Sequence, residues 1–422
     1  LSSLKDRGLL SKPMSGDSNM LNSFSCHNFR NVSVNNLSFS RINLLVGPNN
    51  SGKSNFIKTV TFLSDMLKAE GNTSLKSNFL SAVSRNGWEH MLCNRAGSED
   101  TIDFSWGMTL DGVEVVYSIE CCVGKNISDC RIVSERLSSL EPTDSRYREQ
   151  YNYFSCHKTP GRGYFSTAMK LGKQNRRIML DINCQESVLL QFKELLLSNK
   201  NMYNAPYVRE NIAELLNGLK DYFMSYDVYS ISQFNSNRMR EIASIKNLDS
   251  KLAQDASNFT NLFSNYLSLD PSWRLKFVNR MQQLIPNLTD INIAVRYDHL
   301  ILQLICGEHI YDLSDVSEGT LKALALNIIL HPTDSNSCSS LMLDEPETNI
   351  HPAWQKVIGR WVLTSTGFKQ CFISTHSPDF LDVFTDTFKR GDASIFVFGG
   401  QSDGPYKIKK IMYEDIKDDL GD

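Results

Sequence analysis

The residues best suited to chemistry in this chain form a glycine-containing loop that follows directly on an apolar strand candidate. Its glycines permit backbone torsions that a side chain resists, so successive N–H groups can turn inward toward an anion. A helix expected after the loop points its positive end at the same place. The pattern predicts a site for the phosphates of a nucleoside triphosphate, with Lys53 on the β- and γ-phosphates and Ser54 on Mg²⁺. The predicted binding residues are Gly47, Pro48, Asn49, Asn50, Ser51, Gly52, Lys53, Ser54 and Asn55.

Two acids form a second candidate group, because Asp344 and Glu345 directly follow the apolar run Leu341-Met342-Leu343. A fold built around a phosphate loop needs such an acidic strand beside the loop. We therefore expect Asp344 to hold Mg²⁺ through its water shell. Glu345 is expected to orient or deprotonate the water that attacks the γ-phosphate. An ordinary strand that ends in exposed acids is the alternative.

A histidine ends a third apolar run, Cys371 to Thr375. A lone histidine in this position is commonly a satisfied polar residue. Its order along the chain, after the acidic strand, favours another role for His376. A neutral imidazole there could hydrogen-bond the γ-phosphate and report its loss.

The turn Ser317-Glu318-Gly319-Thr320 opens a helical run that extends from Leu321 to Leu330. Such a turn can bind an anion at the start of a helix. The chain already has one phosphate loop for its own nucleotide. A second anion site would therefore serve the γ-phosphate held by another copy, in a head-to-tail dimer. A plain helix N-cap explains the same residues.

These groups need a sheet whose strands end beside one another. From about Met20 to Leu140 the pattern predicts strands around one helix, with the turn Asp111-Gly112 between two of them. The segment from about 145 to 290 carries leucines at helical spacing and predicts a helical insertion. After Asp290, short apolar runs suit buried parallel strands. We expect the two ends of the chain to form one nucleotide-binding lobe.

Composition sets the class of protein. The 422 residues are 41% hydrophobic and 22% charged, as in soluble globular proteins. A net charge of −3 argues against a wholly basic nucleic-acid coat, although it allows a local basic surface. The chain has no run of about 18 apolar residues and no apolar signal-peptide core, so we expect no membrane association. Ten scattered cysteines without a Cys-x-x-Cys pair disfavour a zinc site and predict reduced thiols in a cytoplasmic protein.

The order of the four motifs resembles that of the ABC-type ATPases, and among them the RecF/SMC/OLD branch. The resemblance covers both ends of the chain and is weak from about 145 to 290. It is carried by Asn28-Phe29-Arg30, the loop 47–54, Val133-Ser134-Glu135-Arg136-Leu137, Ser317-Glu318-Gly319-Thr320, Asp344-Glu345-Pro346-Glu347-Thr348-Asn349-Ile350-His351-Pro352 and Ser374-Thr375-His376-Ser377-Pro378.

The resemblance implies an α/β fold, namely an ABC-type P-loop ATPase head with a mixed sheet, split by a mainly helical insertion. The expected divisions are a disordered lead-in or expression remnant over 1–19, an N-terminal lobe over 20–144, the insertion over 145–290 and a C-terminal lobe over 291–422.

By the same resemblance the chain binds ATP and Mg²⁺, with Lys53, Glu345 and His376 as catalytic residues. Glu345 would be the base and His376 the switch, while Ser317 and Gly319 would act in trans on the partner's nucleotide. The segment 347–351 would lie at the dimer seam. The signature departs from the Leu-Ser-Gly-Gly-Gln of transporters. The glutamine that senses Mg²⁺ is not assigned between Gln233 and Gln254.

Chain length indicates which members of the branch this chain resembles. It has no long coiled coil of the SMC kind, and the 46 residues after His376 (422 minus 376) are too few for the Toprim nuclease domain of OLD proteins. The chain therefore resembles stand-alone ATPase subunits of bacterial anti-phage systems such as Septu, retron-linked and PARIS-type pairs. We expect a homodimer or larger homo-oligomer formed through ATP, which senses infection and controls a separate nuclease or toxin.

Two other functions stay open. One is a RecF-like DNA repair clamp, since the segment 157–180 combines the basic residues Lys158, Arg162, Lys170, Lys173, Arg176 and Arg177 with Tyr164 and Phe165. A solvated loop explains this segment equally well. The other is a nucleotide-gated scaffold with little turnover, in which the segment from Tyr229 to Arg240 could transmit the state of the nucleotide.

Overall fold

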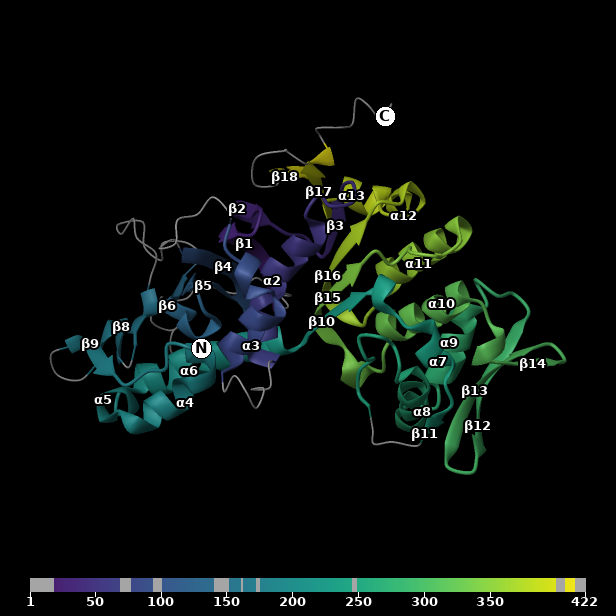
Figure 1. Cartoon of the computed structure of the whole chain (residues 1–422), viewed down its shortest axis with the longest axis horizontal. Coiled ribbons are helices and arrows are strands. Elements are labelled where there is room, and N and C mark those ends of the chain that lie inside the picture. The colour runs from purple at the N-terminus through teal and green to yellow at the C-terminus, as the bar shows by residue number, and fades with distance from the viewer. Residues whose placement is uncertain are drawn as a thin grey trace. The chain divides into compact units, whose positions relative to one another are not determined.

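The computed structural model describes residues 19–68, 77–93, 101–139, 152–160, 162–171, 175–244, 249–399 and 407–413 (Figure 1). The chain divides into two compact units. The first comprises 1–39, 49–226 and 398–410, and the second comprises 40–48, 227–397 and 411–422. The chain therefore passes from one unit to the other between Pro48 and Asn49, inside the predicted phosphate loop.

The first unit contains an antiparallel sheet of eight strands in the order β2-β1-β4-β5-β6-β7-β8-β9. Asp111 and Gly112 join β4 to β5 with φ values of 47° and 75°, which suits the two-residue turn predicted from the sequence. The strands are β1 (Met20–Phe29), β2 (Val32–Ser38), β4 (Thr101–Leu110), β5 (Val113–Cys122), β6 (Arg131–Ser139), β7 (Asn152–Thr159), β8 (Arg162–Leu171) and β9 (Asn175–Leu180).

Helices cover the apolar face of this sheet through aromatic contacts. Phe62 of α2 stacks on Phe104 with ring centroids 4.8 Å apart, and Phe192 of α4 lies 6.4 Å from Phe165. The Trp106 ring nitrogen donates to the main-chain oxygen of Val60 at 3.1 Å. The helices are α2 (Lys53–Lys68), α3 (Asn78–Arg85), α4 (Val188–Ser198), α5 (Lys200–Tyr203), η3 (Tyr207–Ile212) and α6 (Ala213–Met224), with η1 (Trp88–His90) and η2 (Ile127–Asp129).

The predicted helical insertion over 145–290 is not confirmed. Strands β7, β8 and β9 occupy 152–180 and extend the N-terminal sheet, and helices follow only from Val188. The alternate residues Phe154, Cys156 and Lys158 of β7 are buried, as in a strand with one face in the core. The leucine-rich helices that follow these strands led to the prediction of a wholly helical segment, because helical periodicity over a long window outweighs the signal of three short strands.

The second unit contains a mainly parallel sheet in which β3 lies between β16 and β17. An N-terminal strand thus pairs with C-terminal strands on both sides, whereas the rest of the predicted N-terminal lobe belongs to the first unit. The strands follow the order β10 (Tyr226–Ser230), β15 (Cys338–Asp344), β16 (Phe368–Thr375), β3 (Ile42–Val46) and β17 (Ala393–Gly399). The last strand of this order, β18 (Lys407–Ile411), belongs to the first unit except for Ile411.

Helices and a smaller sheet complete the second unit. Helix α10 is buried along its whole length from Thr320 to Leu330, so it forms the centre of the core. The helices are α7 (Ser236–Arg240), α8 (Phe259–Leu269), α9 (Trp273–Met281), α10 (Glu318–Leu330), α11 (Pro352–Thr364), α12 (Pro378–Asp382) and α13 (Thr385–Lys389), with η4 (Ile231–Gln233), η5 (Leu313–Asp315) and η6 (Asp334–Asn336). The smaller sheet holds β11 (Ala243–Ser244), β12 (Leu288–Arg296), β13 (His299–Cys306) and β14 (His309–Asp312).

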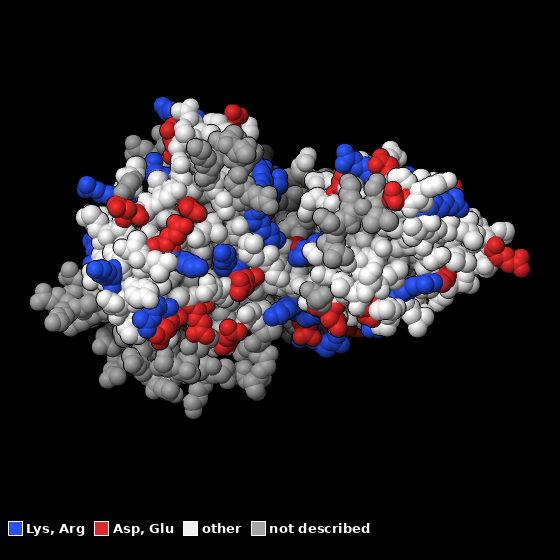
Figure 2. Space-filling model, turned by 90° about the horizontal axis from the view of Figure 1, so that it is seen from below, with Lys and Arg blue, Asp and Glu red and all other residues white. Residues whose placement is uncertain are grey.

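The surface charge is mixed. On the face shown in Figure 2, blue and red side chains are interspersed, in keeping with a net charge of −3. All ten cysteines are free thiols. Within the described ranges, none of the helices has the length and apolar character needed to cross a membrane.

Candidate nucleotide-binding site

The phosphate loop has the backbone of an anion-binding turn. Gly52 has a φ of 96°, which residues with a Cβ rarely adopt, and Asn50 has a φ of 62°. Phe56 N donates to Gly52 O at 2.9 Å, so helix α2 begins inside the loop. Ser51 and Lys53 are only 3% and 5% exposed, and the Ser51 Oγ has no hydrogen-bond partner among the described residues. This geometry fits a bound phosphate group.

The acidic strand and the histidine strand end beside the strand that leads into the loop. In the parallel register, Asp344 pairs with Ser374, and Thr375 pairs with Val46. The residues that follow these pairs, Glu345, His376 and Gly47, therefore leave the same edge of the sheet. The carboxyl edge of a parallel sheet is where α/β folds place their ligands. Of the predicted loop, Gly47 and Pro48 belong to this unit and Asn49 to Asn55 to the first unit.

Glu345 is held in an unusual backbone conformation. Its φ is 51°, in the left-handed region that costs a residue with a Cβ about 1 kcal/mol or more. Its N–H donates to the main-chain oxygen and to the Oγ of Ser374, both at 3.1 Å, and the Ser374 hydroxyl in turn donates to Asp344 Oδ1. Strain of this kind concentrates at functional sites. The two acids are therefore rigidly placed by the neighbouring strand.

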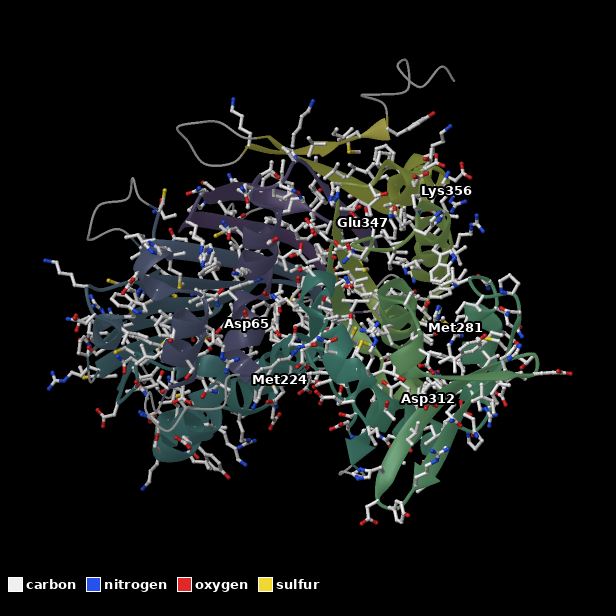
Figure 3. The ribbon with its side chains drawn as sticks, turned by 45° about the vertical axis from the view of Figure 1, so that its right-hand side comes forward. Asp65, Met224, Met281, Asp312, Glu347 and Lys356 are labelled. Carbon is white, nitrogen blue, oxygen red and sulfur yellow. The ribbon has the colours of Figure 1, made fainter. Side chains whose placement is uncertain are left out.

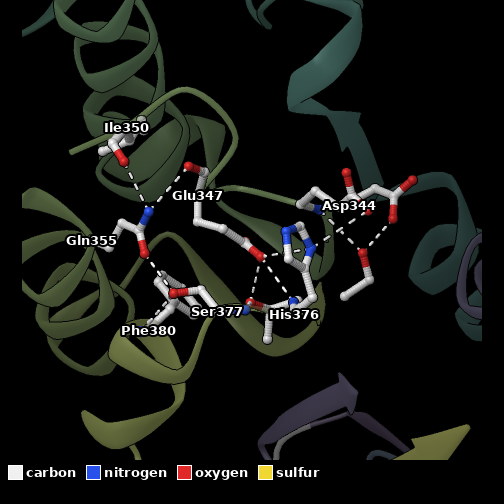
Figure 4. Close-up of polar contacts among 10 residues, drawn as sticks. Asp344, Glu347, Ile350, Gln355, His376, Ser377 and Phe380 are labelled. Atoms are coloured by element: carbon white, nitrogen blue, oxygen red, sulfur yellow. Dashed lines mark hydrogen bonds and ion pairs between the residues drawn. The ribbon is translucent and has the colours of Figure 1, made fainter. Parts of the chain in front are cut away.

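Glu347 holds the end of the histidine strand in place through hydrogen bonds, a role that the sequence did not predict. Its side chain is 3% exposed, and Oε1 accepts hydrogen bonds from Thr375 Oγ1 at 2.6 Å and from His376 N at 2.9 Å (Figure 4). The His376 Nδ1 atom lies 3.5 Å from Glu347 Oε1 and 3.9 Å from Glu345 Oε1. His376 itself is half exposed, at 51%. The imidazole thus stands at the surface, between two carboxylates.

Gln355 connects the two loops around this cluster. Its amide nitrogen donates to Ile350 O at 2.8 Å and its oxygen accepts from Ser377 Oγ at 2.5 Å. The Ser377 hydroxyl also caps helix α12 by accepting from Phe380 N. Glu347 is buried, whereas Lys356, in the same helix as Gln355, has a side chain that is 40% exposed; both are labelled in Figure 3. The spacing between Glu347 and Gln355 matches no known motif, so the sequence alone did not predict that these two residues hold the end of the histidine strand.

The Ser-Glu-Gly-Thr turn begins α10 and is bound to the loop that follows the acids. Ser317 caps the helix by accepting from Thr320 N at 3.2 Å. Glu318 pairs with Lys322 at 3.1 Å and accepts from Asn349 Nδ2 at 3.2 Å, and these contacts hold its pKa below the usual value. A Cβ on Gly319 would lie 3.1 Å from Asn349 O, so a glycine suits this approach. Ser317 and Glu318 are exposed. The turn and the exposed Asn349 therefore present one joined surface.

Asp65 is a titratable group in the helix that follows the phosphate loop. Burial raises its pKa to about 6, and a hydrogen bond from Asn86 opposes the rise. The carboxyl therefore carries a proton at mildly acidic pH.

The two glutamines proposed to sense Mg²⁺ lie in different segments of the second unit. Gln233 and Gln254 are both exposed, and Gln254 donates to Val228 O at 2.8 Å. Gln233 belongs to η4, which directly follows β10 and packs against the acidic strand β15.

The basic and aromatic segment 157–180 is largely structural where it is described. Lys158 is fully buried, 3.5 Å from Glu135, and donates to Glu186 O at 2.6 Å. Phe165 stacks on Phe154 in the core, with centroids 5.4 Å apart. Lys158 and Phe165 therefore cannot contact DNA, which corrects that part of the prediction. Arg177 covers the Tyr164 ring at 4.1 Å and Arg162 is exposed, while Lys173 and the side chains of Lys170 and Arg176 lie outside the described residues.

Comparison with known structures supports the fold. An SMC head bound to the C-winged helix domain of ScpA is 12% identical over 94% of this chain and 99% of its own, with a TM-score of 0.53. The Thermotoga maritima SMC head domain (11% identity, 93% and 99% covered, TM-score 0.42) is a weaker resemblance. So is the Pyrococcus furiosus Smc head with an extended coiled coil, bound to the C-terminal domain of ScpA (12%, 96% and 99%, 0.48). The curated proteins give no match.

A protein-family model covers residues 42–153 and 181–382, which include the phosphate loop, the Ser-Glu-Gly-Thr turn, the acidic strand and His376. The family is described as an AAA domain, putative AbiEii toxin, Type IV TA system. Together with the SMC-head fold, this match assigns the chain to the AbiEii-type AAA family of ABC-type ATPases.

Proposed function

We propose that this chain hydrolyses ATP in a head-to-tail dimer of identical copies. The observation that carries the proposal is the meeting of Gly47, Glu345 and His376 at one edge of the sheet, with Glu345 strained into the left-handed region. In this proposal Lys53 and the loop N–H groups bind the phosphates of ATP.

Glu345 is the proposed general base. Its carboxylate would accept the proton of the water that attacks the γ-phosphate, and the hydrogen bonds from its N–H to Ser374 would hold it in place. His376, positioned by Glu347, would donate a hydrogen bond to the γ-phosphate and sense its departure. The hydroxyl of Ser54 and the carboxylate of Asp344 are oxygen donors of the type that Mg²⁺ prefers. Bound Mg²⁺ would supply neutralisation of the phosphate charge.

Ser317 and Gly319 are the proposed contacts with the nucleotide of the second copy. Ser317 is exposed and Gly319 is partly exposed, at the start of a helix that is buried from Thr320 to Leu330. A helix N-terminus offers unpaired N–H groups to an anion. This arrangement would make ATP itself the link between two copies.

The test is ATP turnover against protein concentration. The wild-type rate per chain should rise with concentration until the dimer is saturated, and Glu345→Gln should bind ATP, dimerise and fail to turn over. A rate that is independent of concentration, or equal rates for the two proteins, would contradict the proposal. Equal rates would favour a nucleotide-gated scaffold.

We propose further that the dimer controls a separate nuclease or toxin in defence against phages. The support is the family description, which names a toxin of a toxin–antitoxin system, and the ScpA domain bound to the similar SMC head. A tagged Glu345→Gln chain, expressed from its own locus with ATP present, should recover an effector protein at a fixed ratio. Recovery of DNA or repair proteins alone would favour the RecF-like clamp.

A further inference from the structure

Arg240 lies beside the Ser-Glu-Gly-Thr turn and has no role in the function proposed above. It is the last residue of α7, a short helix that packs against α10 and η5 and is anchored by the buried Met239. The Nη2 atom of Arg240 donates to the main-chain oxygen of Val316 at 3.0 Å. Because Val316 immediately precedes Ser317, this bond holds the guanidinium at the exposed start of α10.

The guanidinium of Arg240 has more N–H donors than it has hydrogen-bond partners among the described residues. Its Nε is buried without a hydrogen-bond partner, and in the described part of the chain Val316 O is the one acceptor that it contacts. An arginine carries five N–H donors in a planar fork that matches carboxylate and phosphate oxygens. A buried donor without an acceptor is rare in proteins and calls for an explanation.

The neighbouring arginine shows the contrast. Arg238, two residues earlier on the same helix, pairs with Asp255 at 3.1 Å and has a side chain that is 59% exposed. Arg240 forms no such pair with a described carboxylate. The acid closest to its surroundings, Glu318, is already bound by Lys322 at 3.1 Å and Asn349 at 3.2 Å. Arg240 lies close enough to help lower the pKa of Glu318 electrostatically, yet it forms no ion pair with that carboxylate, so an anion that approaches the turn can still accept from its N–H donors.

We propose that Arg240 is a further phosphate-contacting residue, which donates to the γ-phosphate of the nucleotide bound by a second copy of this chain. The inference rests on the proposed dimer. In the closed dimer the guanidinium adds to the helix N-terminus and stabilises the charge that develops on the γ-phosphate oxygens during hydrolysis. Its contact is made only there, so its loss lowers kcat while the affinity of a single chain for ATP is kept.

The first experiment compares Arg240→Ala, Arg240→Lys and the matched control Arg238→Ala in the full chain. We expect kcat to fall about 100-fold for Arg240→Ala, about as much as other transition-state contacts of this kind, with partial rescue by Arg240→Lys. Arg238→Ala should stay within about twofold of the wild type, since exposed ion pairs contribute little. Unchanged melting temperatures and unchanged binding of a fluorescent ATP analogue by the separate chains show that the variants fold. If Arg240→Ala and Arg238→Ala have the same kcat, the inference is wrong.

The second experiment tests action in trans. A mixture of Lys53→Ala and Arg240→Ala chains should recover turnover that neither has alone, because the Lys53→Ala chain offers its intact Arg240 to the nucleotide on the other chain. A parallel mixture of Lys53→Ala with Ser317→Ala, which removes the hydroxyl and leaves room for the second copy, serves as the reference. Recovery in the reference mixture alone rejects the role of Arg240 and keeps the dimer. Recovery in neither mixture rejects the head-to-tail dimer and the inference with it.

Discussion

The chain contains two turns that open helices and could bind anions, and they are built differently. The phosphate loop before α2 has residues in the left-handed region at Asn50 and Gly52 and nearly buries Lys53. The turn before α10 is an ordinary serine N-cap whose Ser317 and Glu318 are exposed. The first surrounds what it binds, whereas the second presents an open surface.

The supports of the two turns differ in the same way. Helix α2 carries no acid in its first turn, whereas α10 begins with Glu318, which Lys322 and Asn349 hold in place. An enclosing loop needs no outside partner to bind a phosphate. An exposed turn, already joined to the loop after the acids, completes a site only when another molecule brings the anion to it. A nucleotide shared between two copies would need both kinds of turn, an enclosing loop on one copy and an exposed turn on the other.

Glu345→Gln gives the largest expected effect, because it removes the base that both turns would serve. We expect kcat to fall about 1,000-fold, within the range seen for positioned general bases. ATP binding should be retained, and the dimer should persist on a sizing column with ATP. A Glu345→Gln protein with wild-type turnover would assign the proton transfer to another group.

Lys53→Ala tests the enclosing loop. Loss of a charge-assisted contact to the phosphates should weaken ATP binding by about 100-fold, measured by calorimetry. Lys58→Ala is the matched control, since Lys58 is exposed on the same helix. Similar affinities for the two variants would show that the loop is not the nucleotide site.

Ser317→Arg tests the exposed turn. A large side chain there should block approach of a second copy and lower turnover about 30-fold, as the loss of about 2 kcal/mol of contact energy would. ATP binding by the single chain should be unchanged, in contrast with Lys53→Ala. Ser314→Arg, at an exposed position just before the turn, is the control. Loss of ATP binding in Ser317→Arg would mean that the two turns bind the same nucleotide within one chain.

Asp65→Asn gives the smallest effect and tests how pH acts on the loop helix. Since burial raises the pKa of Asp65 from 3.8 to about 6, the folded state binds the proton more tightly, and stability is lost as pH rises from about 4 to 6. The variant should therefore be more stable than the wild type above pH 6, by about 1 to 2 kcal/mol. Urea unfolding at pH 5 and pH 7.5 measures this difference, and a gain that is equal at both values would exclude the titration of Asp65.

The pKa of Glu318, in helix α10, is shifted in the opposite direction to that of Asp65. Its pKa is lowered by hydrogen bonds from Lys322 and Asn349, so the stability it contributes is present at neutral pH and is lost as pH falls below its usual range. The two helices should therefore respond to acid in opposite directions, and Glu318→Gln should reduce the acid sensitivity that Asp65→Asn exposes.

Local sequence patterns predicted the strands that carry the site, because each of these strands is a short apolar run that can be recognised by itself. Leu341–Leu343 and Cys371–Ser374 are continuous apolar runs, which suit strands buried on both faces, and they became β15 and β16. The strands at 152–180 were not predicted because their buried positions include polar side chains, such as that of Lys158, and because leucine-rich helices follow them directly in the sequence. Lys158 was read as a surface charge, since nothing in its own neighbourhood names Glu135 as its buried partner.

The sequence by itself determined the ligand class, the family and the order of the motifs, since each depends on a few adjacent residues whose chemistry is local. Tertiary structure alone decided what connects those motifs. The carboxylate of Glu347 below His376, the bond from Asn349 to Glu318 and the placement of Arg240 at Val316 O join residues that are 29, 31 and 76 positions apart. A hydrogen bond depends on distance and angle in space. The pairing of β15 with β16 brings Glu347 to His376, and the packing of α7 and of the loop after β15 against the start of α10 forms the other two bonds only after the chain has folded.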